Sequence, residues 1–185
     1  ATYNFTPDAG QCASSASLST TVNPINVISF SVISSEPFSS NPFIEVIPTM
    51  NDTYFYQLDF GVPQTSNVFE NVSSGIHTIT VSSSDTCTDP LTVEVLIVNY
   101  PKYFTPNGDG YNDTWNIDDL ADQKQSIIYI FDRYGKLIKQ ISPSGKGWDG
   151  TYNGYELPST DYWFSVEYTE KNVSKIFKAH FSLKR

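Results

Sequence analysis

The sequence predicts an all-β chain made of tandem immunoglobulin-like antiparallel β-sandwiches. The first observation is a period-two alternation of side chains in several segments, clearest in residues 53–60 and 162–168. The second is that Gly, Pro, Asn and Ser interrupt this alternation roughly every eight to twelve residues, which is typical of an antiparallel sandwich. The third is size, because 185 residues, 39% of them hydrophobic and 15% aromatic, are enough to bury a core.

The expected strands follow one another along the whole chain. In the first part, the pattern predicts strands at residues 28–32, 53–60, 78–81 and 91–98. In the second part, it predicts strands at residues 127–132, 137–141, 162–168 and 177–183. Only residues 118–126 could form a short helical turn. The final strand should place apolar side chains on one face and polar ones on the other: Phe177, Ala179, Phe181 and Leu183 against Lys178, His180, Ser182 and Lys184.

The net charge of −9 is distributed unevenly. Residues 1–99 contain nine acidic residues and no Lys or Arg, whereas residues 100–185 contain all eleven basic residues and eleven acidic ones. So sharp a change in composition predicts a domain boundary near residues 99–101. It also argues against nucleic acid as a partner of the first part, which has no cation to neutralise phosphates.

A weak internal repeat favours a tandem arrangement. Cys12 and Cys87 lie 75 residues apart in similar contexts, about one immunoglobulin-like repeat. We therefore expect residues 1–23 to be the closing hairpin of a preceding repeat, residues 24–99 to be the last complete repeat and residues 100–185 to be a separate C-terminal domain. The alternative is that residues 1–23 add strands to the next sandwich. A Cys12–Cys87 disulfide is expected only under that alternative, because equivalent positions in successive repeats lie too far apart.

No combination of residues predicts an enzyme. The two histidines, His77 and His180, both lie on alternating strands, where a surface or packed role is expected. The chain has no nucleophile elbow, no phosphate-binding glycine loop and no Cys-x-x-Cys motif. It also has no apolar run long enough for a membrane helix and no signal peptide at its start. Because it opens in what looks like the middle of a strand, we expect it to be the C-terminal part of a longer protein.

One loop could bind a metal ion. In residues 104–113, oxygen-bearing side chains alternate and a glycine follows, as in the first half of a calcium loop. On that template the ligands are Asn107, Asp109 and Asp113, and no other cofactor is expected. The alternative is a turn in which Asn and Asp side chains bond to their own backbone.

Several motifs in residues 100–185 occur in a fixed order. They are Phe104 to Ile117 (FTPNGDGYNDTWNI), Ile130 to Ile138 (IFDRYGKLI), Gly147 to Gly150 (GWDG), Asn153-Gly154, Leu157 to Phe164 (LPSTDYWF) and Lys178 to Arg185 (KAHFSLKR). Together they resemble the gliding-motility-associated C-terminal domain, the type B sorting domain of the type IX secretion system of Bacteroidota. The residues that carry the resemblance are Phe104, Pro106, Asn107, Gly108, Asp109, Gly110, Asn112, Asp113, Trp115, Arg133, Gly135, Trp148, Asp149 and Gly150. Ala179 departs from the Gly that is usual before the His. Residues 24–99 are similar, more loosely, to repeats of large flavobacterial surface adhesins.

The resemblance implies a sorting role. Such domains lie at the C-terminus of proteins that cross the inner membrane. The type IX translocon recognises these proteins and exports them from the periplasm to the cell surface or the medium. It implies the translocon and a SprF-like outer-membrane protein as partners, upstream passenger domains in the same chain, and no direct insertion into the membrane.

The last strand is the candidate for recognition. Lys178, His180, Lys184 and Arg185 form a basic row that a partner could read by strand addition. The alternative is that the apolar row is core and the lysines protect an edge strand from aggregation. The loop at Arg133 and Gly135 is expected to be a hairpin turn, with a positive φ at the glycine, and Trp148 is expected to pack under a loop.

Two other functions remain open at this point. In the first, Tyr54, Phe55 and Tyr56 stack on sugar rings, and residues 24–99 are a glycan- or surface-binding adhesion module. Alternatively, the chain is the appendage of a secreted hydrolase whose catalytic domain lies upstream.

Overall fold

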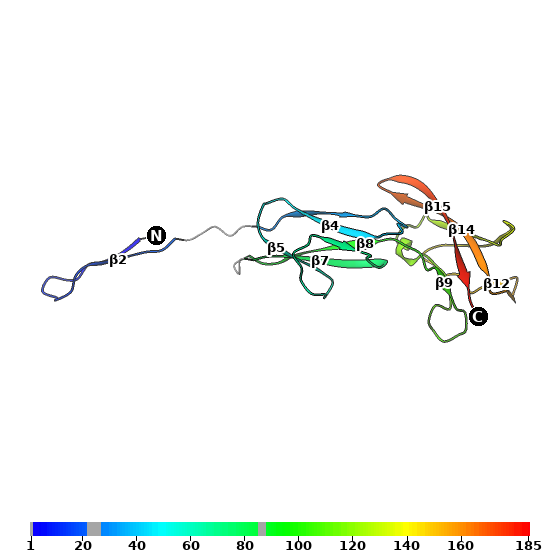
Figure 1. Cartoon of the computed structure of the whole chain (residues 1–185), viewed down its shortest axis with the longest axis horizontal. Helices are drawn as coiled ribbons and strands as arrows, with labels where there is room; N and C mark the ends of the chain where they lie inside the picture. The colour runs from blue at the N-terminus through cyan, green and yellow to red at the C-terminus, as the bar shows by residue number, and fades with distance from the viewer. Residues whose placement is uncertain (1, 22–26, 85–87) are drawn as a thin grey trace.

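The computed structural model describes residues 2–21, 27–84 and 88–185, and it is all-β, with 47% of these residues in strands or isolated β-bridges. In these ranges the single helical element is a 3-10 turn, Asp118–Leu120, within the segment expected to turn. Three bodies follow one another along the long axis, an N-terminal hairpin, a β-sandwich and a C-terminal β-domain (Figure 1). The described residues include no helix with the length and apolarity needed to cross a membrane.

The hairpin consists of β1 (Thr2–Phe5) and β2 (Ala16–Ser19), which pair only with each other. All its strand residues are exposed, and it does not add to a neighbouring sheet. Cys12, in its loop, is exposed. Because Cys87 lies outside the described residues, the expectation about a Cys12–Cys87 bond stays a prediction.

The sandwich consists of two three-stranded sheets. One sheet has the order β3 (Phe30–Ser34), β4 (Phe43–Pro48), β6 (Val68–Glu70), and the other has the order β5 (Tyr54–Leu58), β7 (Gly75–Ser83), β8 (Leu91–Ile97). The alternating inward residues of both sheets form one apolar core, with Ile44, Val46, Ile79 and Val81 fully buried.

Tyr54 and Tyr56 belong to this core. Each is only 6% exposed, whereas Phe55, on the opposite face of β5, is 37% exposed. The expectation that this group of rings stacks on external sugars is therefore wrong for the two tyrosines, because their faces are covered by protein.

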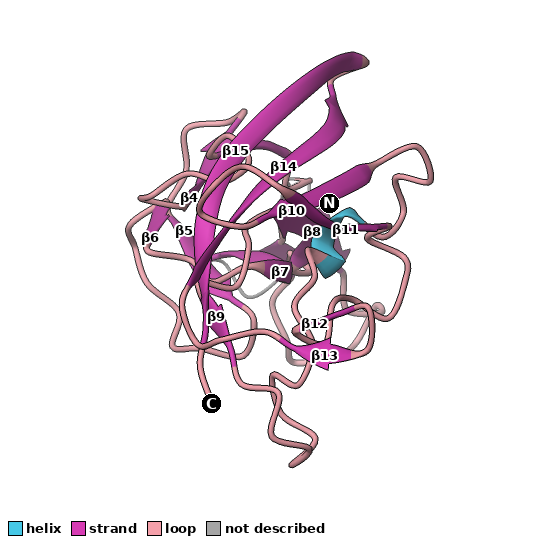
Figure 2. Cartoon of the chain, turned by 90° about the vertical axis from the view of Figure 1, so that its right-hand side faces the viewer, coloured by secondary structure: helices cyan, strands magenta, loops and turns pink. Residues whose placement is uncertain are grey.

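The C-terminal domain is built on a five-stranded sheet that curves across it (Figure 2). Its order is β11 (Leu137–Ile141), β10 (Ile127–Phe131), β14 (Asp161–Glu170), β15 (Val173–Leu183), β9 (Tyr103–Phe104). A small hairpin, β12 (Thr151–Tyr152) with β13 (Tyr155–Glu156), accompanies it. As predicted, β10 and β11 form a hairpin, and Gly135 in its loop has φ +80°.

One pairing differs from the purely antiparallel prediction. β9 runs parallel to β15, with Tyr103 opposite Ser182 and Phe104 opposite Leu183. The backbone N–H of Lys184 donates to the carbonyl of Phe104 at 3.0 Å. The end of β15 is thus already paired on both sides, so strand addition by a partner is blocked there.

Aromatic rings dominate the core of this domain. The Trp115 ring stacks on Phe181 with centroids 3.8 Å apart, and Trp115 and Trp148 pair through both backbone hydrogen bonds. Each indole N–H has a carbonyl acceptor, Pro101 at 2.7 Å for Trp115 and Thr151 at 2.8 Å for Trp148. These tryptophans can therefore be fully buried without an unpaired donor. Trp148 lies in the core, where its ring meets that of Tyr162 edge-on at 5.0 Å.

Candidate recognition surface

The outer face of the five-stranded sheet carries two cross-strand rows of side chains. Successive side chains of a strand alternate between its two faces. Because Phe164 and Val166 of β14 are buried, Trp163 and Ser165 of the same strand point outward. The strand register places Phe131, Trp163 and His180 in one row and Tyr129, Ser165 and Lys178 in the next. An outer sheet face is ordinarily polar, so three aromatic rings here are unusual.

These rows surround a hollow of about 700 Å³. The small side chain of Ser165 forms part of its floor, because it stands between the larger Tyr129 and Lys178 of the neighbouring strands. Trp163 is 43% exposed, and its ring lies 6.2 Å from that of His180 between centroids. The hollow can therefore present apolar ring surface to a partner.

The hollow also carries positive charge. Among the described residues, no carboxylate forms an ion pair with Lys178 or with Arg133, both of which line it. The Arg133 guanidinium donates to the hydroxyl of Thr160 at 2.9 Å. The one acidic side chain of the lining, Asp132, already accepts the backbone N–H groups of Tyr134 and Lys136 at 2.8 and 2.9 Å. An anionic group of a partner would find two cations without ion-pair partners here.

The structure brings together only part of the predicted recognition row. Lys178 and His180 line the hollow, and Lys184 follows the end of β15, with its ammonium 4.3 Å from the centre of the Tyr103 ring. Arg185 is used by the fold, since its guanidinium donates to the carbonyls of Leu157 and Gly150. The rings of Tyr129, Phe131 and Trp163 were not predicted to belong to this surface. The signal for Trp163 was its position on the polar side of the β14 alternation.

The loop after β9 is held by its own side chains. The Asp113 carboxylate accepts the backbone N–H groups of Asn107, Gly108 and Gly110 at 3.1, 2.7 and 2.8 Å. These hydrogen bonds, from Gly108 above all, lower the pKa of Asp113. Asn107 and Asp109 bond to each other, with the Asn107 amide 2.8 Å from Asp109 Oδ2. The three predicted calcium ligands thus satisfy one another and the backbone, which favours the alternative interpretation of a turn.

The remaining motif residues have structural positions. Phe104 and Trp115 are core, and Asn112 lies in the left-handed region at φ +51°. Asp149 Oδ1 accepts the N–H and the hydroxyl of Thr151 at 3.0 and 2.8 Å. Pro106 is partly buried at the base of the loop. These positions and contacts explain why the core and the turns need these motif residues. They give no sign that the same residues contact a partner.

The histidines do not form a catalytic group. His77 is buried, with Nδ1 2.9 Å from Asp59 Oδ2 and Nε2 3.0 Å from the carbonyl oxygen of Ser73. His180 is exposed in the other domain. Within the described residues, no three His, Cys, Asp or Glu side chains are grouped as a metal site would require.

Residues 98–183 match the profile of the CHU_C type IX secretion signal domain. The C-terminal domain is a type IX secretion signal. This match extends over the five-stranded sheet, the aromatic core and the hollow on its outer face. The signal domain sorts its chain for export to the cell surface through the type IX secretion system, and it is of a non-catalytic type.

No curated protein matches the sequence. Among solved structures, the BSP domain of a biofilm-associated protein is similar over 82% of this chain and 29% of that chain, with 11% identity and a TM-score of 0.25. A likeness of this degree carries no argument about function.

Proposed function

We propose that the type IX translocon reads the signal domain through the hollow on the outer face of its sheet, together with a SprF-like outer-membrane protein that retains the chain at the surface. In this proposal Lys178 and His180, with Arg133, contact the partner, and Lys184 extends the basic row. Residues 24–99 act as a spacer or adhesin repeat, and residues 1–23 close a preceding repeat. The chain is non-catalytic, and its passenger domains lie upstream.

One observation supports this choice of surface above others. The hollow combines the exposed ring of Trp163 and the half-buried rings of Tyr129 and Phe131 with two cations that have no ion-pair partner among the described residues, on the face of the sheet that faces away from the domain core. Exposed rings and Arg are the side chains that most often dominate binding energy at protein interfaces. An acidic segment bearing an apolar side chain would satisfy both features.

Export of the whole chain tests the proposal. The full chain is placed behind a signal peptide and a fluorescent protein, in a type IX-competent bacterium and in a translocon-null strain. We expect surface fluorescence in the competent strain only. The double variant Lys178→Glu with Trp163→Ala should reduce it at least about tenfold, because charge reversal and ring removal both act at the centre of the interface.

The matched control is Lys146→Glu, which reverses an exposed lysine of the same domain outside the hollow. It should be exported like the parent chain. Purified protein from each variant must keep the parent melting temperature, so that misfolding is not mistaken for lost recognition. Equal export of the double variant and the control would contradict the proposed surface while leaving the sorting role intact.

A further inference from the structure

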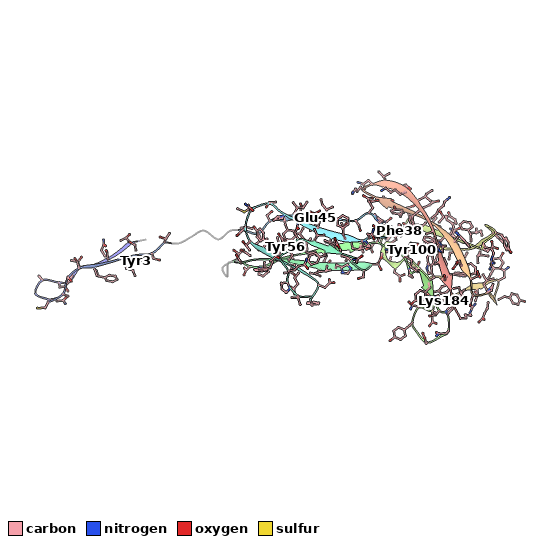
Figure 3. The ribbon with its side chains drawn as sticks, viewed as in Figure 1. Tyr3, Phe38, Glu45, Tyr56, Tyr100 and Lys184 are labelled. Carbon is pink, nitrogen blue, oxygen red and sulfur yellow. The ribbon has the colours of Figure 1, made fainter. Side chains whose placement is uncertain are left out.

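A loop of the sandwich reaches into the core of the signal domain. Phe38, between β3 and β4, is only 7% exposed, yet its neighbours are residues of the C-terminal domain. Its ring stacks on Phe177 with centroids 4.3 Å apart and meets the Tyr168 ring edge-on at 5.3 Å. Tyr100 lies 6.2 Å away, and Figure 3 shows Phe38 and Tyr100 together at the boundary between the two bodies. We call the three rings around Phe38, those of Tyr100, Tyr168 and Phe177, the aromatic socket.

The backbone of Phe38 is strained to reach this position. Its φ of +64° lies in the left-handed region, which a bulky side chain rarely adopts. Such a conformation persists only where the surroundings compensate for it. The compensation from across the boundary is the socket, which covers the ring. The Phe38 N–H also donates to the carbonyl of Val98 at 2.9 Å, in the segment that joins the two bodies.

Polar contacts surround the socket. Glu36 forms ion pairs with Lys175 at 3.2 Å and Lys171 at 3.7 Å, and Lys175 also pairs with Glu170 at 2.6 Å. The Asn99 backbone N–H donates to Asp119 at 3.1 Å. The Asn99 amide donates to the carbonyl of Ser39 at 3.3 Å. The segment that joins the two bodies is therefore bonded to both of them.

We propose that the signal domain has a binding site for the repeat that precedes it, and that Phe38 of this repeat completes the domain core. The ligand is an aromatic side chain presented by a tight loop, with an acidic residue two positions earlier to meet Lys171 and Lys175. The sandwich and the signal domain are therefore stabilised as one unit. The inference is independent of which surface the translocon reads.

Tryptophan fluorescence gives a selective test, because Trp115, Trp148 and Trp163 all lie in the signal domain. In the full chain, Phe38→Gly removes the ring and relieves the left-handed backbone of the sandwich loop. If the Phe38 ring did not stabilise the signal domain, this change would leave the fluorescence midpoint of thermal unfolding unchanged. Because we infer that the ring completes the core of the signal domain, we expect the midpoint to fall by at least about 10 °C. The control is Phe60→Gly, which removes a fully exposed ring of the same sandwich.

A second measurement keeps the inference falsifiable if Phe38→Gly disturbs the sandwich itself. The fluorescence midpoints of Phe38→Ala, Phe177→Ala and the double variant form a cycle across the boundary. We expect the double variant to lose clearly less than the sum of the single losses, because the two rings stack on each other. Additive losses, or a Phe38→Gly midpoint equal to that of the parent chain, would overturn the inference.

Discussion

Asp113 holds the loop that follows β9 through its carboxylate. Three backbone N–H groups donate to this side chain, which lowers its pKa from the ordinary value of 3.8. A lowered pKa in the folded state means that the carboxylate adds stability above the unfolded value. That contribution is lost as the pH falls through the folded value.

We therefore expect Asp113→Asn to lower the melting temperature of the chain at pH 7, and the gap between the two proteins to narrow as the pH falls below 3.8. Melting curves of both proteins between pH 3 and 8 measure this. A gap between the two that stays constant across the range would mean that the charge of Asp113 is not what holds the loop.

The same loop makes a prediction about calcium. Because the oxygens of Asn107, Asp109 and Asp113 already accept hydrogen bonds, a bound ion would have to displace them. We expect the melting temperature to be the same in millimolar calcium and in excess chelator. A rise with calcium would restore the metal-site interpretation, since an ion that binds only the folded state at a hundred times its Kd adds about 2.7 kcal/mol.

Two glycines in neighbouring turns separate backbone strain from crowding. Gly150 and Gly154 have nearly the same φ, +79° and +82°, but only Gly150 is crowded. A Cβ at Gly150 would lie 2.7 Å from Leu183 Cδ1 and 3.1 Å from an Arg185 nitrogen, whereas a Cβ at Gly154 would meet nothing within 4 Å.

We expect Gly154→Ala to cost about 1–2 kcal/mol in the free energy of unfolding, the cost of the left-handed backbone alone. Gly150→Ala should cost about 2–5 kcal/mol, because overpacking against β15 adds to it. Denaturant unfolding followed by tryptophan fluorescence measures both. Equal losses would show that the contact of this turn with β15 contributes nothing to stability.

At the scale of the elements, alternation predicted those strands that have one buried face. β14 and β15 place Phe164, Phe181 and Leu183 inward as expected, and Gly135 takes the predicted left-handed turn. β9 could not be foreseen, because two residues have no period. Its parallel partner lies about eighty residues away in the sequence, and no local pattern specifies such a pairing.

The candidate surface was predicted in part for the same reason. Lys178 and His180 were found because β15 alternates clearly, but the hollow depends on which residues stand opposite them on β14 and β10. Arg185 was expected to face a partner. Its guanidinium is instead committed to carbonyls of the turns beneath β15, a contact that no spacing in the sequence reveals.

At the scale of the whole molecule, the change in charge composition near Asn99 marks the boundary between the sandwich and the signal domain. The two bodies contact each other across this boundary. The aromatic socket draws Phe38 across the boundary. Composition could locate the boundary but not this contact, because Phe38 has no pattern that separates it from a residue of the sandwich core. Its left-handed backbone is visible only in the folded chain.

The parallel pairing of β9 with β15 has a consequence for synthesis. The first strand of the signal domain, β9, has no strand to pair with until the last strand, β15, has been synthesised. The Trp115 ring likewise lacks its stacking partner until Phe181 has been added. A polypeptide that stops before β15 lacks Lys178 and His180 and cannot close the aromatic core. Only a chain translated through β15 can therefore fold into a complete signal domain, so incomplete chains would lack a folded export signal.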